Sequence, residues 1–137
     1  VFGSIVAEEA DPARRRERFR RGLLAYQDSF SVMEKVRVPV LAAVQGGCIG
    51  GGVDMISACD MRYCTADAFF TIKEIDLGMT ADVGTLQRLP HLIPQGLVRE
   101  LAYTGRALSA QEALRAGLVN TVYASQAEML EGVMGIA

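Results

Sequence analysis

Five glycines lie between residues 46 and 52, directly after an apolar run at 39–44, and Asp54 follows them. Glycine permits positive φ and lets another backbone or a ligand come close. The first N–H groups of a helix that starts here would have no partner within the helix and would lie at its positive end. Such a turn can receive an oxygen on which negative charge develops during a reaction. A tight strand-to-helix turn with an acidic first-turn residue is the alternative, and this stretch alone leaves both open.

Three carboxylates are the other candidates for chemistry: Asp54, Glu74 and Asp82. Each of them also has a purely structural explanation. Asp54 could complement the helix dipole, which stabilises a helix by about 0.3–1 kcal/mol. Asp82 could cap the next helix, an interaction of about 0.5–2 kcal/mol, and Glu74 could be a solvated residue after a strand. Local spacing does not decide between catalysis and structure for any of the three.

The composition indicates one globular domain and argues against several other classes. The chain has 137 residues, of which 50% are hydrophobic and 22% are charged, enough for one core. A net charge of −2 gives no whole-chain attraction to nucleic acid or anionic membranes. No apolar run approaches the roughly 20 residues of a membrane span. Because the chain starts at Val1 and stops inside a helical pattern, we expect residues 1–137 to be part of a longer protein.

Other familiar sites are not matched. The three cysteines form no C-x-x-C pair, and their odd number predicts reduced, buried thiols in an intracellular compartment. His91 has no cysteine or acid at ligand spacing, so we expect no metal site. The hydrolase, P-loop and dinucleotide-binding motifs are also missing from the sequence.

Helices and strands are expected to alternate along the chain, so the predicted class is α/β. Apolar residues recur at spacings of four and three from Phe19 to Met33, which predicts a long amphipathic helix over 13–36. Ser109 and Glu112 fit a capping box. The other expected helices cover 53–59, 83–89, 95–103, 109–116 and 125 to the end. The expected strands cover 38–44, 61–65, 68–72 and 118–123, and 73–82 is expected to be a loop.

Six arginines lie between residues 14 and 21 against one glutamate, Glu17. A contact to phosphate or RNA is one interpretation. The segment contains a single aromatic residue, Phe19, and that residue belongs to the apolar stripe. A solvated helix face is therefore favoured over nucleic-acid binding.

Taken in order, several short motifs resemble the crotonase superfamily of enoyl-CoA hydratases and isomerases. The resemblance covers about residues 30–122. Its motifs are Ala42-Ala43-Val44-Gln45-Gly46, Gly50-Gly51-Gly52, Cys59-Asp60, Gly84, Gln87-Arg88-Leu89, Thr104-Gly105-Arg106 and Gly117-Leu118-Val119.

The resemblance implies a fold and a class of substrate. The fold would be a spiral of ββα turns, here partial, and the substrates acyl-CoA thioesters. No separate cofactor is implied, because coenzyme A is part of the substrate. Trimers paired into hexamers are expected, in mitochondria or peroxisomes of a eukaryote or in bacterial cytoplasm. Gly51 would supply one of two N–H groups of an oxyanion hole; the second donor and the CoA contacts are expected upstream of Val1.

The three acids discriminate among the family's activities. Hydratases of the family carry glutamates at the positions of Asp54 and Glu74, and commonly glycine at the position of Asp82. The family's dienoyl-CoA isomerases carry all three acids found here. This resemblance implies isomerisation of 3,5-dienoyl-CoA to 2,4-dienoyl-CoA in fatty-acid β-oxidation. We expect Asp82 to remove the C2 proton, Glu74 to serve C6, or the reverse, and Asp54 to support them. A hydratase, a Δ3-Δ2-enoyl-CoA isomerase and an RNA-binding family member are the alternatives.

Overall fold

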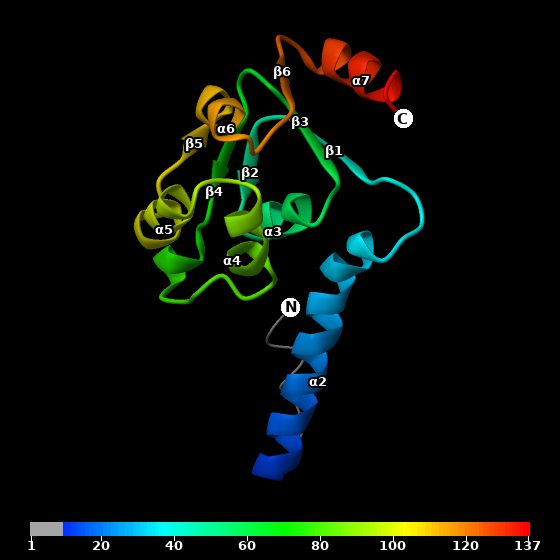
Figure 1. Cartoon of the computed structure of the whole chain (residues 1–137). Coiled ribbons are helices and arrows are strands. Elements are labelled where there is room, and N and C mark those ends of the chain that lie inside the picture. The colour runs from blue at the N-terminus through cyan, green and yellow to red at the C-terminus, as the bar shows by residue number, and fades with distance from the viewer. Residues whose placement is uncertain (1–9) are drawn as a thin grey trace.

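The first four strands of the chain alternate between two small sheets. The structure is a computed structural model and describes residues 10–137 (Figure 1). The first sheet consists of three parallel strands in the order β1 (Leu41–Val44), β3 (Met61–Thr65) and β6 (Thr121–Tyr123). The second sheet has the order β2 (Gly47–Ile49), β4 (Phe69–Thr71) and β5 (Leu108–Ser109), with only the last pair antiparallel. Each of the pairs β1/β2 and β3/β4 gives one strand to each sheet, which is the predicted ββα spiral.

Helices connect and cover these strands. The α-helices are α2 (Pro12–Ser31), α3 (Gly51–Ser57), α4 (Thr85–Arg88), α5 (Gln95–Thr104), α6 (Ala110–Ala116) and α7 (Gln126–Met134). Three 3₁₀ turns complete the described elements: η1 (Val32–Glu34), η2 (Glu74–Leu77) and η3 (Leu89–His91). The capping box of α6 is confirmed, because the Glu112 N–H donates to Ser109 Oγ at 3.3 Å and the Ser109 N–H to Glu112 Oε2 at 2.9 Å.

Several sequence-based predictions of elements were wrong; among them, the strands expected from residues 38 and 118 begin at Leu41 and Thr121, and strand β5 was not predicted. The α-helix expected over 13–36 ends at Ser31, and the chain continues as the 3₁₀ turn η1 to Glu34; the restriction that Pro39 places on Val38 excludes helix only beyond this point. Residues 47–49 were expected within a turn but pair in parallel with residues 69–71. The loop expected over 73–82 contains the turn η2, which ends at Gly78 with φ 68°.

The main core lies between the second sheet and helices α3 to α6. Apolar side chains of α3, of both sheets and of α5 and α6 fill it, among them Val53, Phe70, Leu101 and Leu118. Burying such a side chain stabilises a fold by about 1.5–3 kcal/mol relative to leaving it exposed. The core therefore holds α3, and with it the glycine turn, in a fixed place.

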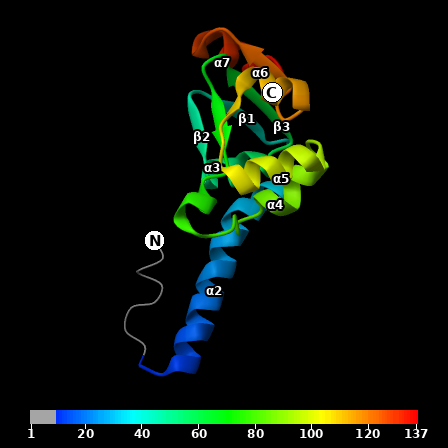
Figure 2. The same ribbon diagram turned by 90° about the vertical axis from the view of Figure 1, so that its left-hand side faces the viewer.

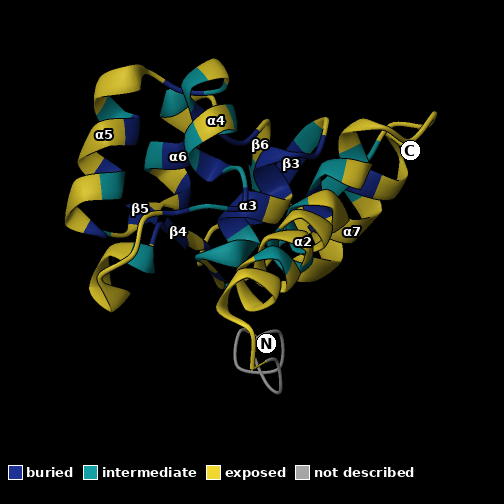
Figure 3. Cartoon of the chain, turned by 90° about the horizontal axis from the view of Figure 1, so that it is seen from below, coloured by how far each residue is buried: buried dark blue, intermediate teal, exposed yellow. Residues whose placement is uncertain are grey.

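Helix α2 packs against the rest of the molecule only near its C-terminal end. Phe30 is its one buried residue, and the first half extends away from the sheets in two perpendicular views (Figures 1 and 2). Seen from below, most of α2 is exposed while β3 is buried (Figure 3). The predicted apolar stripe is therefore partly uncovered, with Phe19 38% exposed.

The three cysteines are buried, as the sequence predicts. Cys48, Cys59 and Cys64 are free, buried thiols, and burial raises the pKa of Cys48 to about 12. From residue 10 onward, no helix combines the length and apolar character needed to cross a membrane.

Candidate active site

The glycine turn joins β2 to α3 and is tied to the second sheet. The Gly50 N–H donates to the Thr71 carbonyl at 2.9 Å, and Gly50 adopts φ 52° and ψ −115°, a conformation that residues with a side chain rarely adopt. Helix α3 begins at Gly51, so the Gly51 N–H has no partner within the helix. The turn therefore presents a backbone donor from a rigid position.

The Glu74 carboxylate lies directly against this turn. A Cβ built on Gly50 would be 2.9 Å from Glu74 Oε1, so Glu74 occupies the space that a side chain at position 50 would need. Its Oε2 atom is buried and has no hydrogen-bond partner. An unpartnered buried carboxylate oxygen is costly, which is typical of a group held for a function. The structure thus brings Glu74 and the Gly50–Gly51 turn together.

Asp54 is held one turn further into α3. Its side chain is 1% exposed, and Oδ1 accepts hydrogen bonds from the Thr85 N–H at 2.7 Å and from Thr85 Oγ1 at 2.6 Å. Its Oδ2 atom is buried without a partner. One oxygen of Asp54 is therefore held by Thr85, while the other is buried without a hydrogen bond.

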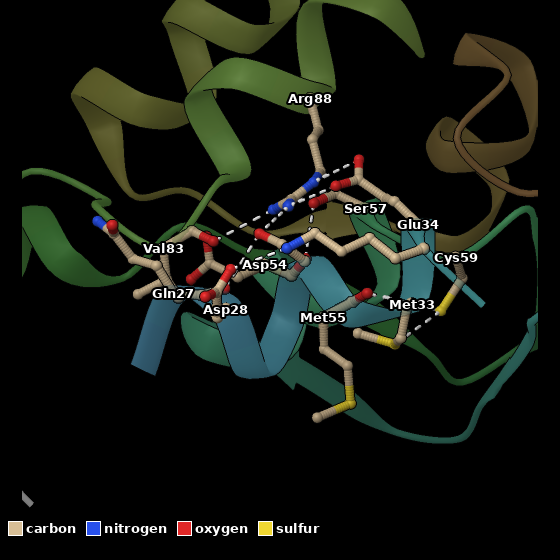
Figure 4. A network of polar contacts seen from close by, with 12 residues as sticks. Gln27, Asp28, Met33, Glu34, Asp54, Met55, Ser57, Cys59, Val83 and Arg88 are labelled. Atoms are coloured by element: carbon tan, nitrogen blue, oxygen red, sulfur yellow. Dashed lines mark hydrogen bonds and ion pairs between the residues drawn. The ribbon is translucent and has the colours of Figure 1, made fainter. Parts of the chain in front are cut away.

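Asp82 lies in the segment that leads into α4, three residues before Thr85. Its backbone carbonyl accepts a hydrogen bond from Gln27 Nε2 of α2 at 2.7 Å. It is partly exposed and lines a hollow of about 510 Å³ between α2 and α4, together with Gln27, Ser31, Glu34, Val83, Gly84, Gln87, Arg88 and His91. Figure 4 shows the neighbouring Val83 and Gln27 beside Arg88 and Asp54. Within residues 10–137 no hydrogen bond or ion pair occupies the Asp82 carboxylate.

All three predicted acids therefore lie around α3. Asp54 belongs to this helix, Glu74 contacts the residue before it, and Asp82 is connected to it through Thr85. Thr85 and Gln27 were missed by the sequence analysis, although both fix this region. Their hydrogen-bond partners lie 31 and 55 residues away along the chain, and no local pattern in the sequence predicts such contacts.

The arginine cluster lies apart from these acids, on the exposed first half of α2 (Figure 2). Arg20 and Arg21 donate to Glu17 at 2.9 and 2.8 Å, and these hydrogen bonds lower the pKa of Glu17 to about 2. The cluster is thus partly neutralised within its own helix. Among the residues described, no group of histidine, cysteine and acidic side chains could hold a metal ion.

The sequence profile described as enoyl-CoA hydratase/isomerase matches residues 11–136. This chain belongs to the enoyl-CoA hydratase/isomerase family. Among its relatives in that family, the human mitochondrial Δ(3,5)-Δ(2,4)-dienoyl-CoA isomerase is 50% identical over 139 aligned residues, covering 100% of this chain and 42% of the relative. The peroxisomal enzyme of the same name from Arabidopsis thaliana is 50% identical, covering 93% of this chain and 46% of the relative. The chain thus spans less than half the length of these relatives.

Solved structures of the enoyl-CoA hydratase/isomerase family agree with the fold. A probable enoyl-CoA hydratase/isomerase from Mycobacterium abscessus superposes with a TM-score of 0.83 at 30% identity, over 96% of this chain and 49% of that one. A putative enoyl-CoA hydratase from Thermobifida fusca, solved in complex with acetoacetyl-CoA, has a TM-score of 0.82 at 30% identity, over 86% and 46%. The predicted family and ββα fold are confirmed.

Proposed function

We propose that the protein containing this chain is a dienoyl-CoA isomerase that converts 3,5-dienoyl-CoA into 2,4-dienoyl-CoA in fatty-acid β-oxidation. The observation that carries the proposal is the set of three acids around α3, within a chain 50% identical to dienoyl-CoA isomerases. Those relatives are named for this reaction, and about half of the residues of this chain are shared with them.

The reaction moves two conjugated double bonds by one proton removal and one proton delivery. Asp82 takes a proton from C2, which becomes acidic because the resulting negative charge is delocalised onto the thioester oxygen. The double bonds then shift, and Glu74 delivers a proton at C6. Because C2 and C6 lie several ångströms apart, two carboxylates on different segments suit the task better than one. The two roles could also be exchanged, with Glu74 taking the proton from C2 and Asp82 delivering the proton at C6.

The Gly51 N–H is proposed as one donor of the oxyanion hole. A donor aimed at the thioester oxygen stabilises the charge that develops there, by roughly 2.7–4 kcal/mol in comparable sites. The fixed conformation of Gly50 and the absence of an intrahelical partner for the Gly51 N–H support this role. Asp54 is buried and accepts two hydrogen bonds from Thr85. We propose that it supports the other two acids through polarity or hydrogen bonding rather than by contacting substrate.

Other properties are proposed from the family relationship. The substrate supplies coenzyme A, so no separate cofactor is proposed. We also propose a trimer or a pair of trimers, and a location in mitochondria or peroxisomes of a eukaryote or in the cytoplasm of a bacterium. Relatives named for mitochondria and peroxisomes support the first two locations, and a bacterial relative supports the third.

Hydration is the second candidate reaction. Carnitinyl-CoA dehydratase of Salmonella typhi is 44% identical over 99 residues, which are 72% of this chain and 38% of that protein. The shorter side chain of Asp54, where the family's hydratases place a glutamate, favours isomerisation over activation of water.

Assays of the full-length protein with two substrates separate these reactions. With 3,5-dienoyl-CoA we expect the absorbance of a diene conjugated to the thioester to appear, and with 2-enoyl-CoA we expect hydration to be far slower. Faster hydration than isomerisation would overturn the proposal in favour of a hydratase.

A further inference from the structure

Two polar side chains hold consecutive carbonyl groups of the segment that carries Asp82. Gln27 Nε2, from α2, donates to the Asp82 carbonyl at 2.7 Å. Arg88 Nη1, from α4, donates to the Val83 carbonyl at 3.2 Å. The Asp82 segment, which comprises residues 79–84, is thus fixed from two helices at the point where its acid lies.

Arg88 is itself held rigidly. Its Nε donates to Glu34 Oε1 and its Nη2 to Glu34 Oε2, both at 2.9 Å. Nη2 also donates to Ser31 Oγ at 3.0 Å. Paired donation of this kind fixes the plane of a guanidinium as well as its position. Figure 4 shows the Arg88 side chain between Glu34 and Val83. Since only 13% of this side chain is exposed, solvent competes little for these bonds.

Gly84 makes room for this arrangement. Its φ is 125°, and a Cβ at this position would overlap Arg88 Nη1. The guanidinium therefore passes over the bare backbone of Gly84 to reach the carbonyl of the residue before it. On the other side of Gly84, the Thr85 N–H is bonded to Asp54, so the chain is anchored on both sides of Gly84.

The Asp82 carboxylate has no hydrogen bond or ion pair of its own within residues 10–137. Its position consequently depends on the backbone that carries it. A proton is transferred efficiently only when donor and acceptor atoms are held near their contact distance, and a misplacement of about 1 Å can cost roughly 10²-fold in rate.

We propose that Gln27 and Arg88 are positioning residues for Asp82: together with Glu34 and Ser31 they fix its backbone so that the carboxylate reaches C2 of the substrate. The inference rests on the proposed isomerase function for its catalytic part. Its structural part, the immobilisation of the Asp82 segment, stands independently of any activity.

The test uses Gln27→Met in the full-length protein. Methionine keeps the length of the side chain and removes the donor to Asp82. We expect kcat with 3,5-dienoyl-CoA to fall roughly tenfold while KM stays within about twofold, because an interaction that matters in the transition state is lost. Gln111→Met, on the exposed surface of α6, is the matched control and should leave both constants unchanged.

Two further readouts separate positioning from general damage. Deuterium at C2 of the substrate should slow Gln27→Met more than wild type, because proton removal becomes the slower step, and the same effect should appear in Arg88→Met. Arg115→Met, another exposed substitution on α6, is the control for the arginine. In addition, the Thr85 amide, which follows the segment and donates to Asp54 at 2.7 Å, should exchange with solvent faster in Gln27→Met than in wild type, while the amides of α5 should not.

Each result has a defined meaning. Unchanged kcat and unchanged isotope effect in both variants would overturn the catalytic part of the proposal. Unchanged exchange of the Thr85 amide would overturn the structural part. A wild-type protein that forms no 2,4-dienoyl-CoA would refute the proposed function and the catalytic part together, and amide exchange would still decide whether the two side chains hold the segment.

Discussion

At the scale of single residues, Gly50 determines where the Glu74 carboxylate can lie. A Cβ at position 50 would be 2.9 Å from Glu74 Oε1, and φ there is +52°. Gly50→Ala should therefore displace Glu74 and strain the turn. We expect kcat to fall by roughly 10²-fold and the free energy of unfolding to fall by about 1–3 kcal/mol, measured by steady-state kinetics and denaturant titration.

Gly96→Ala provides the control for this prediction, because a Cβ at Gly96 of α5 would meet nothing within 4 Å. That variant should retain both activity and stability. Full activity in Gly50→Ala would show that the position of Glu74 beside the turn is irrelevant to turnover.

The contribution of the Thr85 hydroxyl to stability can also be measured separately. Thr85→Val removes the hydroxyl that donates to Asp54 Oδ1 at 2.6 Å and keeps the backbone donor at 2.7 Å. The loss of a buried hydrogen bond to a carboxylate should lower the free energy of unfolding by about 1–3 kcal/mol. Thr85→Ser keeps the hydroxyl and should remain within about 1 kcal/mol of wild type. Equal stability of the valine and serine variants would contradict this account of Asp54.

The sequence alone singled out the proposed site residues, but not the residues that hold them in place. Asp54, Glu74 and Gly51 belong to motifs that lie close together along the chain or to a known family pattern. Thr85 and Gln27 are visible only after folding, because their bonds join segments 31 and 55 residues apart. A threonine or glutamine with a distant partner looks the same in a sequence as one that faces solvent.

At the scale of elements, the ion pair between Glu34 and Arg88 connects η1 to α4. The hydrogen bonds from Arg88 hold the pKa of Glu34 below its ordinary value of 4.5. A carboxyl whose pKa is lowered in the folded state stabilises the fold above its ordinary pKa, and this contribution is lost as pH falls through the folded value. Because the Glu34 side chain is 48% exposed, we expect only about 0.2–1 kcal/mol.

Glu34→Gln tests this pH dependence. The free energy of unfolding of wild type should exceed that of the variant most at pH 7, and the difference should shrink as pH falls below 4.5, the ordinary pKa. Glu131→Gln, on the exposed face of α7, should show no such trend. A difference that grows toward acid pH would contradict a stabilising role for the ionised Glu34 carboxylate.

The elements that the sequence predicted well are those whose signals are local. The capping box gave the start of α6, and Gly105, with φ 60° after α5, gave the end of that helix. Strand β2 was missed because Gly47 to Ile49 carry no strand pattern and gain their hydrogen bonds from β4, some 20 residues later. The end of α2 was misplaced because the apolar period continues to Met33 beyond the α-helix.

At the scale of the whole molecule, the arginine cluster lies far along α2 from the acids (Figures 1 and 2). Replacing Arg14, Arg15 and Arg16 with glutamine should therefore leave turnover of 3,5-dienoyl-CoA unchanged. RNA retention by the full-length protein should be weak and equally weak in the triple variant, measured by filter binding at about 50 and 200 mM salt. Strong retention that the triple variant loses, with steep salt dependence, would instead favour an RNA-binding function.

The central claim is that carboxylates around the glycine turn move protons along a dienoyl thioester. The most direct measurement compares the rate of 2,4-dienoyl-CoA formation by the full-length wild type, by Asp82→Asn and by Asp67→Asn, an exposed aspartate outside the site. We predict a wild-type rate well above that without protein, a loss of at least roughly 10²-fold in Asp82→Asn, and no loss in Asp67→Asn. No product from wild type, or undiminished turnover in Asp82→Asn, would contradict the account.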